Sequence, residues 1–417
     1  MMRDLFSPGG KHMSAILDGI KVLDLTRVVA GPWATQNLAD MGATVYKIEK
    51  PGDGDDTRKM GPFLNDAQGA ATNDSAFYLA CNRGKQSLTI DISQPEGAEL
   101  VRQLAARCDV VVENYKAGSL KKYGLDYESI RAVRPDVIYC SVTGFGPDGP
   151  YAARPAYDFI LQGMAGLMST CGQPDGSPGG EPMRTAIPIT DILTGLYATV
   201  SLLGALYHRQ ATGEGQYIDA AMLDASVAVN GHLALGYQMT GKLPRRAGNS
   251  NPVAAPSEVF ACRDGHLIIA SGNNGQFAAL CKLLGIPELA ADPRYTQNAN
   301  RVANRDALRE TIAERVATWN AADLLASLER AGVPGGPINE LDEVFEDAQV
   351  KHRGLLVQLP HGRGVDVPSL RSPMRFSATP VAMRCPPMLG EHTDAALRAE
   401  LGLSDGDVAG LRARGIL

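Results

Sequence analysis

The chain has 417 residues, of which 44% are hydrophobic and 21% are charged, and this length accommodates two or more packed domains. Its formal net charge of −6 gives no general electrostatic reason to expect binding to nucleic acid or to acidic lipid, so neither partner is predicted. The seven cysteines are odd in number and never form a C-x-x-C pair, which indicates a reducing, cytoplasmic location without a disulfide framework or a zinc ribbon.

Residues 1–13 contain little that would pack into a core, and they lack the apolar segment of a signal peptide. A disordered leader is expected there, with Met13 as an alternative start. The most apolar stretch, Ile192 to Tyr207, is 16 residues long and contains Thr and Ser. That falls short of the roughly 20 residues that a membrane span needs, so no membrane segment is predicted.

Strand and helix signals alternate along the first 145 residues. The predicted strands are short and apolar, as expected when both faces of a sheet are covered. They comprise residues 20–26, 44–49, 87–92, 110–112 and 137–142. Helices are predicted at 32–41, with Pro32 in the first turn, and at 95–107, where apolar residues have helical spacing. The alternation predicts a doubly wound, Rossmann-like α/β domain, in which ligands bind beyond the carboxyl ends of the strands.

A second pattern begins near residue 155. Successive helices are predicted at 157–168, 192–210 and 221–239, and a loop rich in Gly, Pro and Arg follows at 243–256. Two apolar strands, 258–262 and 266–271, then flank Arg263-Asp264-Gly265 and form a hairpin signal. Further helices are predicted at 275–284, 303–317, 321–331 and 392–401, and short strands at 353–385.

These patterns predict a large α/β domain and a smaller α+β domain. The large domain is expected to begin with residues 14–222, and residues 223–250 are expected to form a linker. The small domain is expected at 251–340, and residues 341–417 are expected to return to the large domain.

Several familiar site patterns are absent or incomplete. Gly144 to Gly149 matches G-x-G-x-x-G, but Pro147, Pro150 and Pro155 would break the helix that must start inside such a loop, so a nicotinamide site is disfavoured. The seven histidines form no H-x-x-x-H pair, so no metal site is predicted. No G-x-S-x-G turn is present.

Basic residues gather near the predicted strand ends. Each alone is most simply a solvated surface charge, whereas together they could bind a phosphorylated cofactor. They are Arg27, Lys50, Arg83, Lys85, Lys121 and Lys122.

Asp191 lies between a proline-broken apolar stretch, 186–190, and the long apolar run that follows it. A carboxylate in such a place must be capped, paired or used in chemistry. Its position alone favours a helix N-cap, in which its oxygen accepts a hydrogen bond from a backbone N–H two or three residues on. A catalytic role is compatible with capping, because helix-terminal amides keep a carboxylate ionised and fixed in direction.

Ordered blocks of sequence carry a family resemblance. They lie at 17–58, 81–104, 109–114, 137–169, 190–195 (TDILTG), 292–306, 332–339 and 389–394 (LGEHTD). They resemble the class III coenzyme A-transferases, which include formyl-CoA transferase, carnitine CoA-transferase and, as a divergent branch, alpha-methylacyl-CoA racemase. The resemblance implies an interlocked homodimer of ring-like subunits. It also implies coenzyme A as a co-substrate, with no tightly bound cofactor.

The resemblance implies that Asp191 is the nucleophile. Its carboxylate would attack the thioester of a donor acyl-CoA, giving a mixed anhydride and the coenzyme A thiolate. The thiolate would then attack the aspartyl carbonyl to form an aspartyl-CoA thioester, and the acceptor acid would repeat these steps in reverse. With a free pKa of about 3.9, the carboxylate is expected to be ionised at neutral pH without a base.

The resemblance also assigns binding residues. Coenzyme A is expected to contact Arg27, Val28, Val29, Ala30, Lys50, Ile90, Asp91, Ile92, Ser93, Asn114, Tyr115, Lys116 and Lys122. Arg154 and Tyr157 match a segment that borders the thioester. The simpler interpretation of each is ordinary structure at the end of a strand.

Two departures from the family pattern bear on the reaction. Tyr157 stands where the racemase branch carries a His, and Tyr, with a free pKa of about 10, is poorly suited to the acid/base pair that racemisation needs. Gly248 and Asn249 stand where formyl-CoA transferase has a run of glycines, and Met60 where it has a Trp. These differences weigh against oxalate and formate as substrates.

The favoured reaction is therefore transfer of coenzyme A from succinyl-CoA to a dicarboxylic acid. The candidates for binding the distal carboxylate are Arg154, Arg184, Arg245 and Arg246. The alternatives are an alpha-methylacyl-CoA racemase, a formyl-CoA:oxalate transferase and a non-catalytic protein that binds coenzyme A.

Overall fold

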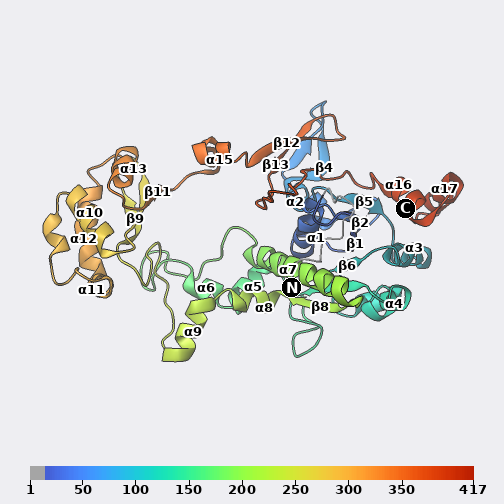
Figure 1. Cartoon of the computed structure of the whole chain (residues 1–417), viewed down its shortest axis with the longest axis horizontal. Helices are drawn as coiled ribbons and strands as arrows, with labels where there is room; N and C mark the ends of the chain where they lie inside the picture. Colours follow the sequence, from blue (N-terminus) through green and yellow to red (C-terminus); the bar gives the residue numbers. More distant parts are fainter. Residues whose placement is uncertain (1–14) are drawn as a thin grey trace, which may run out of the picture. The chain divides into compact units, whose positions relative to one another are not determined.

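The computed structural model describes residues 15–417, and its chain divides into two compact units (Figure 1). Unit 1 takes up the chain to Leu167, Thr185–Leu235 and Gln349–Leu417, whereas unit 2 takes up Met168–Arg184 and Gly236–Ala348. The sequence interpretation had assigned residues 168–184 to the large domain. The expected leader, 1–13, lies outside the described residues.

Unit 1 is built on a six-stranded parallel sheet with the strand order β5-β2-β1-β6-β7-β8. The strands are β1 (Lys21–Asp24), β2 (Thr44–Glu49), β5 (Gln86–Thr89), β6 (Val110–Glu113), β7 (Ile138–Thr143) and β8 (Tyr217–Ala221). If the six strands of this sheet are numbered in chain order, their spatial order is 3-2-1-4-5-6. The chain first adds strands on one side of β1 and then, from β6 onward, on the other side. Such folds bind ligands at that reversal, beyond the carboxyl ends of the strands.

Helices cover both faces of this sheet, because successive strand residues point to opposite sides. Val22 packs with α1 (Ala30–Asp40) and α7 (Ile189–Thr212) in one buried cluster. Its neighbour Leu23 packs in a second cluster with α3 (Pro95–Ala105), α4 (Tyr127–Val133) and α16 (Thr393–Leu401). The predicted α/β layering of the large domain is therefore confirmed in its coarse form, a large parallel sheet within a mixed α/β fold.

Two predicted helices are each divided into two in the structure. The helix expected at 157–168 is α5 (Asp158–Met164) followed by α6 (Leu167–Thr170), with Gly166 between them at a φ of +88°. The helix expected at 221–239 is α8 (Met222–Ala228) and α9 (Gly231–Thr240). A left-handed glycine breaks a helix because it turns the backbone away from the helical path.

Helix α7 has 24 residues, so the length argument against a membrane span was wrong. The helix is long and apolar enough to cross a membrane by those criteria alone. In the structure, however, one side of it is packed on the sheet through Ala198, Leu202 and Ala205, which are all buried. We therefore describe α7 as a core helix of unit 1.

A late segment of the chain covers the β5 edge of the sheet. The backbone N–H of His392 donates to the carbonyl oxygen of Ser87 over 3.0 Å, and the N–H of Thr89 donates to Oγ1 of Thr393 over 3.0 Å. The N–H of Asp91 donates to the carbonyl oxygen of Ile416 over 2.8 Å. Helix α17 (Asp405–Ala413), which the sequence interpretation did not include, follows α16 here.

Unit 2 contains a three-stranded antiparallel sheet in the order β11-β10-β9. The hairpin predicted around Arg263-Asp264-Gly265 is confirmed as β9 (Ser257–Ala261) and β10 (His266–Ala270). Four helices pack with it or beside it: α10 (Asn274–Leu283), α11 (Asn298–Ala303), α12 (Arg305–Val316) and α13 (Ala321–Arg330). The core of the unit includes Phe260, Leu267 and Phe277.

The remaining elements are short. They are β3 (Phe63–Asn65), β4 (Ala71–Ser75), β11 (Gly335–Pro337), β12 (Leu356–Pro360), β13 (Asp366–Leu370), α2 (Ala76–Cys81), α14 (Leu341–Glu346), α15 (Ala348–His352) and the 3-10 helices η1 (Asp56–Lys59), η2 (Ser119–Tyr123) and η3 (Pro287–Ala290).

Candidate active site

Asp191 lies in the first turn of α7 as its third residue, and the N-cap position is occupied by Pro188. The prediction that Asp191 is the N-cap was therefore wrong. The helix begins three residues earlier than an N-cap at Asp191 would place it, and another side chain accepts from the free backbone N–H of Thr190 in its first turn. Asp191 is left available for a different role.

Asp158, the first residue of α5, supplies the bonds that begin α7. Its Oδ1 accepts hydrogen bonds from the backbone N–H of Thr190, over 2.7 Å, and from Oγ1 of Thr190, over 2.6 Å. Its Oδ2 accepts from Nε2 of Gln162 over 2.7 Å. The start of the helix that carries Asp191 is thus fixed to α5 by a carboxylate, the side-chain group best suited to free helix amides.

Burial raises the pKa of Asp191 to about 7, and the negative charge of Asp158 adds to the shift. The expectation of a fully ionised carboxylate at neutral pH is therefore wrong, since a group with this pKa is only about half ionised there. Carboxyl groups shifted this far are concentrated at functional sites, where a desolvated environment and a neighbouring charge adjust reactivity.

The start of α1 lies against α7 one turn after Asp191. A Cβ placed on Gly195 would come within 2.7 Å of the carbonyl oxygen of Ala30 and 3.0 Å of Cβ of Trp33. Only a residue without a side chain allows this approach. Since α1 begins just beyond the carboxyl end of β1, Asp191 lies at the ligand-binding edge of the sheet.

The loop between β1 and α1 is bound to the loop after β6, at the reversal point of the sheet. The backbone N–H of Arg27 donates to Oδ1 of Asn114 over 2.8 Å, and Nδ2 of Asn114 donates to the carbonyl oxygen of Arg27 over 2.7 Å. The Arg27 guanidinium lies 4.9 Å from the centre of the Tyr115 ring. The structure therefore brings together Arg27, Asn114 and Tyr115, which were predicted as binding residues from separate parts of the sequence.

Two buried ion pairs lie near this edge of the sheet. The sequence interpretation did not predict these pairs. Nζ of Lys47 lies 2.8 Å from Asp55 Oδ2, and Nζ of Lys85 lies 2.9 Å from Asp24 Oδ2. Burial alone would raise the pKa of Asp24, but the charges of Lys85 and Lys47 lower it to about 2. The available signal was Lys47 itself, a charge in the middle of an apolar strand, which must find a partner when it is buried.

The other predicted coenzyme A residues lie along the same edge. After β2, Lys50 is exposed and its Nζ lies 2.6 Å from Asp53 Oδ2. After β5, Ile90 is buried and Asp91 Oδ1 accepts from the N–H of Ser93 over 2.9 Å. Ile92 follows Asp91 in this turn, and Lys122 lies in η2 with Nζ over the Tyr123 ring. Val29 and Ala30 begin α1.

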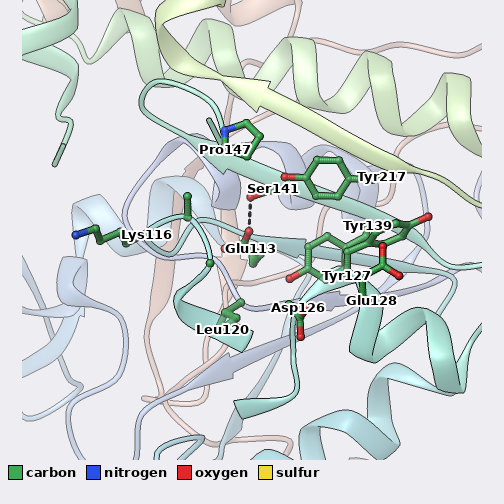
Figure 2. A pocket seen from close by; sticks show the side chains of 12 residues that line it. Glu113, Lys116, Leu120, Asp126, Tyr127, Glu128, Tyr139, Ser141, Pro147 and Tyr217 are labelled. Carbon is green, nitrogen blue, oxygen red and sulfur yellow. Dashed lines mark hydrogen bonds between the residues drawn. The ribbon is translucent and has the colours of Figure 1, made fainter. Parts of the chain in front are cut away.

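A cavity of about 280 Å³ opens beside this edge (Figure 2). Its lining comprises Glu113, Lys116, Ala117, Gly118, Leu120, Asp126, Tyr127, Glu128, Tyr139, Ser141, Pro147 and Tyr217. Burial raises the pKa of Glu113 to about 7, although Ser141 Oγ and the backbone N–H of Tyr115 donate to its carboxylate. Lys116, a predicted binding residue, follows Asn114 and Tyr115 and lies at the wall of this cavity.

Three predicted substrate residues lie at the surface of unit 1. Tyr157 takes the N-cap position of α5, directly before Asp158, and is 69% exposed. The Arg154 guanidinium lies 4.5 Å from the ring centre of Tyr151. Met60 is exposed after η1.

The other predicted substrate residues belong to unit 2. Gly248 has a φ of +58°, and Asn249 is exposed beside it. Arg246 forms an ion pair with Asp175, and Arg245 Nη1 lies 3.8 Å from the same carboxylate. The structure therefore does not group these residues in the unit that carries Asp191. Arg184 is likewise a residue of unit 2.

Comparison with known proteins gives a consistent result over almost the whole chain. Residues 17–393 match the family described as CoA-transferase family III. Succinate–glutarate CoA-transferase of Agrobacterium fabrum is 48% identical over 387 residues, which cover 92% of this chain and 95% of that protein. Succinyl-CoA:glutarate CoA-transferase of Mus musculus is 40% identical over 403 residues, or 96% of this chain and 90% of that protein.

A solved structure gives the same comparison in three dimensions. The crystal structure of a CAIB/BAIF family protein from Brucella suis is similar with a TM-score of 0.83 and 48% identity. The match covers 93% of this chain and 100% of that chain.

Proposed function

This chain belongs to CoA-transferase family III and is a CoA-transferase, and we propose that it transfers coenzyme A from succinyl-CoA to a dicarboxylic acid such as glutarate. The observation that carries this proposal is Asp191, a desolvated carboxylate at the ligand-binding edge whose helix is capped by a different residue. The named reactions of the two relatives support the choice of donor and acceptor.

The proposed reaction proceeds through covalent intermediates on Asp191. A carboxylate oxygen of Asp191 bonds to the acyl carbon of succinyl-CoA, and the C–S bond breaks to release the thiolate and leave a mixed anhydride. The thiolate then bonds to the aspartyl carbonyl carbon and succinate departs, giving the aspartyl-CoA thioester. The incoming dicarboxylate attacks this thioester and the thiolate returns to the acyl carbon of the new anhydride, which regenerates Asp191.

The local environment of Asp191 suits this sequence of steps. A carboxylate removed from water is a stronger nucleophile, because less hydration must be lost before it attacks. Asp158, bound to Thr190, keeps the first turn of α7 in place without occupying the oxygens of Asp191. Tyr157 stands where the racemase branch carries an acid/base residue, so transfer remains the favoured chemistry.

The proposal includes a homodimer. Besides the face that packs on the sheet, α7 has an exposed face with Leu196, Tyr197, Val200 and Tyr207. Apolar side chains gathered on one face at helical spacing are typical of a protein interface. A second copy of this chain is the proposed partner, in the interlocked arrangement that the family resemblance implies. The seven unpaired cysteine thiols support a reducing, cytoplasmic location.

The nucleophile is tested by Asp191→Asn, which keeps the shape of the side chain and removes its charge. Incubation with succinyl-CoA and a panel of carboxylic acids, read by mass spectrometry, should show new acyl-CoA species for the wild type. The variant is expected to lose at least about 10³-fold in kcat, because the covalent route is closed. Hydroxylamine should attack the aspartyl-CoA thioester of the wild type, leaving a hydroxamate on Asp191 and releasing coenzyme A, and it should not modify the variant in this way.

A matched control is available in unit 2. Asp323 is also the third residue of a helix, α13, and it is exposed, so Asp323→Asn should leave kcat unchanged. Near-normal transfer by Asp191→Asn would refute the covalent mechanism. Loss of configuration at a chiral 2-methylacyl-CoA, with no transfer to any acid, would favour the racemase alternative instead.

A further inference from the structure

The loop between β1 and α1 contains a backbone conformation that valine rarely adopts. Val28 has a φ of +68°, and among the described residues it is the one non-glycine residue with a positive φ. The branched Cβ of valine is crowded by the backbone in this region, so the conformation persists only where its surroundings stabilise it. Strain of this kind is found at ligand-binding and catalytic sites more often than elsewhere.

Asn114 stabilises the residue before Val28. Its side-chain amide accepts from the N–H of Arg27 over 2.8 Å and donates to the carbonyl oxygen of Arg27 over 2.7 Å. Both polar atoms of the Asn114 amide therefore bond to the backbone of one residue. This fixes the peptide plane on each side of Arg27, and the second of these planes begins Val28.

A buried ion pair stabilises the same loop through bonds to the residues on either side of Arg27. Nζ of Lys47 donates to the carbonyl oxygen of Thr26 over 2.9 Å and to Oδ2 of Asp55 over 2.8 Å. Oδ1 of Asp55 accepts from the N–H of Val28 over 3.2 Å. The backbones of three consecutive residues, 26 to 28, are thus bonded to the side chains of Lys47 in β2, Asn114 just after β6 and Asp55 just before η1.

We infer that Asn114 is a positioning residue for acyl-CoA binding, which acts by keeping Arg27 and Val28 in the strained conformation that places the start of α1 at the carboxyl edge of the sheet. This inference rests on the proposed function. It differs from the role that the family resemblance gave Asn114, which was direct contact with coenzyme A. The amide of Asn114 is directed at the Arg27 backbone, and the ligand contacts fall to the loop that Asn114 supports.

The inference is tested by Asn114→Ala alone and together with Val28→Gly. Without the Asn114 bonds, valine is expected to leave the left-handed region, so Kd for coenzyme A and KM for succinyl-CoA should rise about tenfold or more. Glycine adopts the left-handed conformation without support. The double variant should therefore recover to within about threefold of the wild type in both quantities.

Controls separate this role from a general structural one. Asn65 is an exposed asparagine of β3, and Asn65→Ala should leave Kd and KM unchanged. If Asn114 were merely structural, its removal would lower the folded fraction and hence kcat, with KM unaffected, and that result would overturn the inference. A rise in Kd that Val28→Gly does not reverse would also overturn it, because it would assign Asn114 to direct contact with the ligand.

A readout without ligand distinguishes failure of this inference from failure of the proposed function. The backbone N–H of Trp33 donates to the carbonyl oxygen of Val29 over 2.7 Å, and the chain has only one other tryptophan, Trp319. In a Trp319→Phe background, emission from Trp33 should change in Asn114→Ala and return in the double variant. Unchanged emission would overturn the inference, whereas a wild-type chain that binds no coenzyme A would contradict the proposed function.

Discussion

Asp158 and Asp191 divide two tasks that a single carboxylate could have performed. Asp158 accepts both hydrogen bonds from Thr190 at the start of α7. Asp191, one residue later, is placed in a desolvated position where its pKa rises to about 7. A capping carboxylate has its lone pairs occupied and is a poor nucleophile, so the division leaves Asp191 reactive.

The charge of Asp158 should contribute to the pH dependence of transfer, in addition to the larger effect of burial on the pKa of Asp191. The reactive form of Asp191 is the ionised one, so activity should fall as pH decreases through about 7, and only about a tenth of the groups are ionised at pH 6. Asp158→Asn removes the negative charge, which should lower the pKa of Asp191 and move this limb of the kcat profile to lower pH. The ratio of kcat at pH 6 to kcat at pH 8 should therefore increase.

A second variant separates charge from capping. Asp158→Ala removes both, and loss of a helix cap is expected to lower the free energy of unfolding by about 1 kcal/mol. Burial raises the pKa of the Cys81 thiol to about 12, so this group stays neutral throughout the assay range. If Asp158→Asn did not shift the pH profile of kcat, the proposed electrostatic effect of Asp158 on Asp191 would be contradicted.

At this scale the sequence offers candidate residues but not their bonding partners. The family resemblance proposes Asp191, Arg27 and Asn114 as site residues, and those roles stay predictions. Which side chain bonds to which was not predictable, because Asn114 and Arg27 are 87 positions apart and Asp158 and Thr190 are 32 apart. Such pairs depend on strand order, and alternation of strands and helices does not determine that order.

At the scale of elements, the contact between α1 and α7 sets the position of Asp191. Gly195→Ala would place a methyl group 2.7 Å from the Ala30 carbonyl oxygen, so one helix must move. We expect the free energy of unfolding to decrease by about 1–3 kcal/mol. Transfer should slow by about tenfold or more, because the nucleophile is displaced from the bound thioester.

Gly236, in helix α9, is the matched control. A Cβ there would meet nothing within 4 Å, and alanine favours the helix over glycine by up to about 1 kcal/mol. Gly236→Ala should therefore leave transfer unchanged and raise the melting temperature, as measured by circular dichroism. Equal effects of the two substitutions would show that close packing at Gly195 does not matter.

Elements with clear signals in their own sequence were predicted well, and elements that depend on tertiary pairing were not. The strand at 44–49 was predicted with both ends correct, since its apolar residues are flanked by clear turn residues. Strand β8 (Tyr217–Ala221) was missed, because it is an edge strand with Asp219 at its centre and it directly precedes a helix. Residues 217–221 form a strand because they pair with β7, and this tertiary contact is not visible in their own sequence.

At the scale of the whole molecule, the exposed face of α7 predicts self-association. Val200 is 67% exposed and Tyr207 is 77% exposed on a helix whose other face is core. Light scattering should give the mass of two chains for the wild type. Val200→Glu with Tyr207→Glu should lower that mass toward one chain, because two charges would have to be buried at the interface.

Leu341 in α14 is also 77% exposed, and Leu341→Glu serves as the comparison outside α7. It should leave the mass of two chains unchanged. A wild-type chain that is monomeric at micromolar concentration would contradict the proposed homodimer.

The late segment on the β5 edge has a consequence for how the protein is made. The N–H of Thr89 bonds to Thr393, which is synthesised 304 residues later, and the N–H of Asp91 bonds to Ile416. Neither bond can form until the end of the chain has been made. On a ribosome that adds about 5–20 residues each second, the part of the proposed coenzyme A site at residues 90–93 therefore stays open for tens of seconds after β5 has been synthesised. During that time β5 is an uncovered sheet edge, the kind of surface that chaperones bind and that nascent chains use to aggregate.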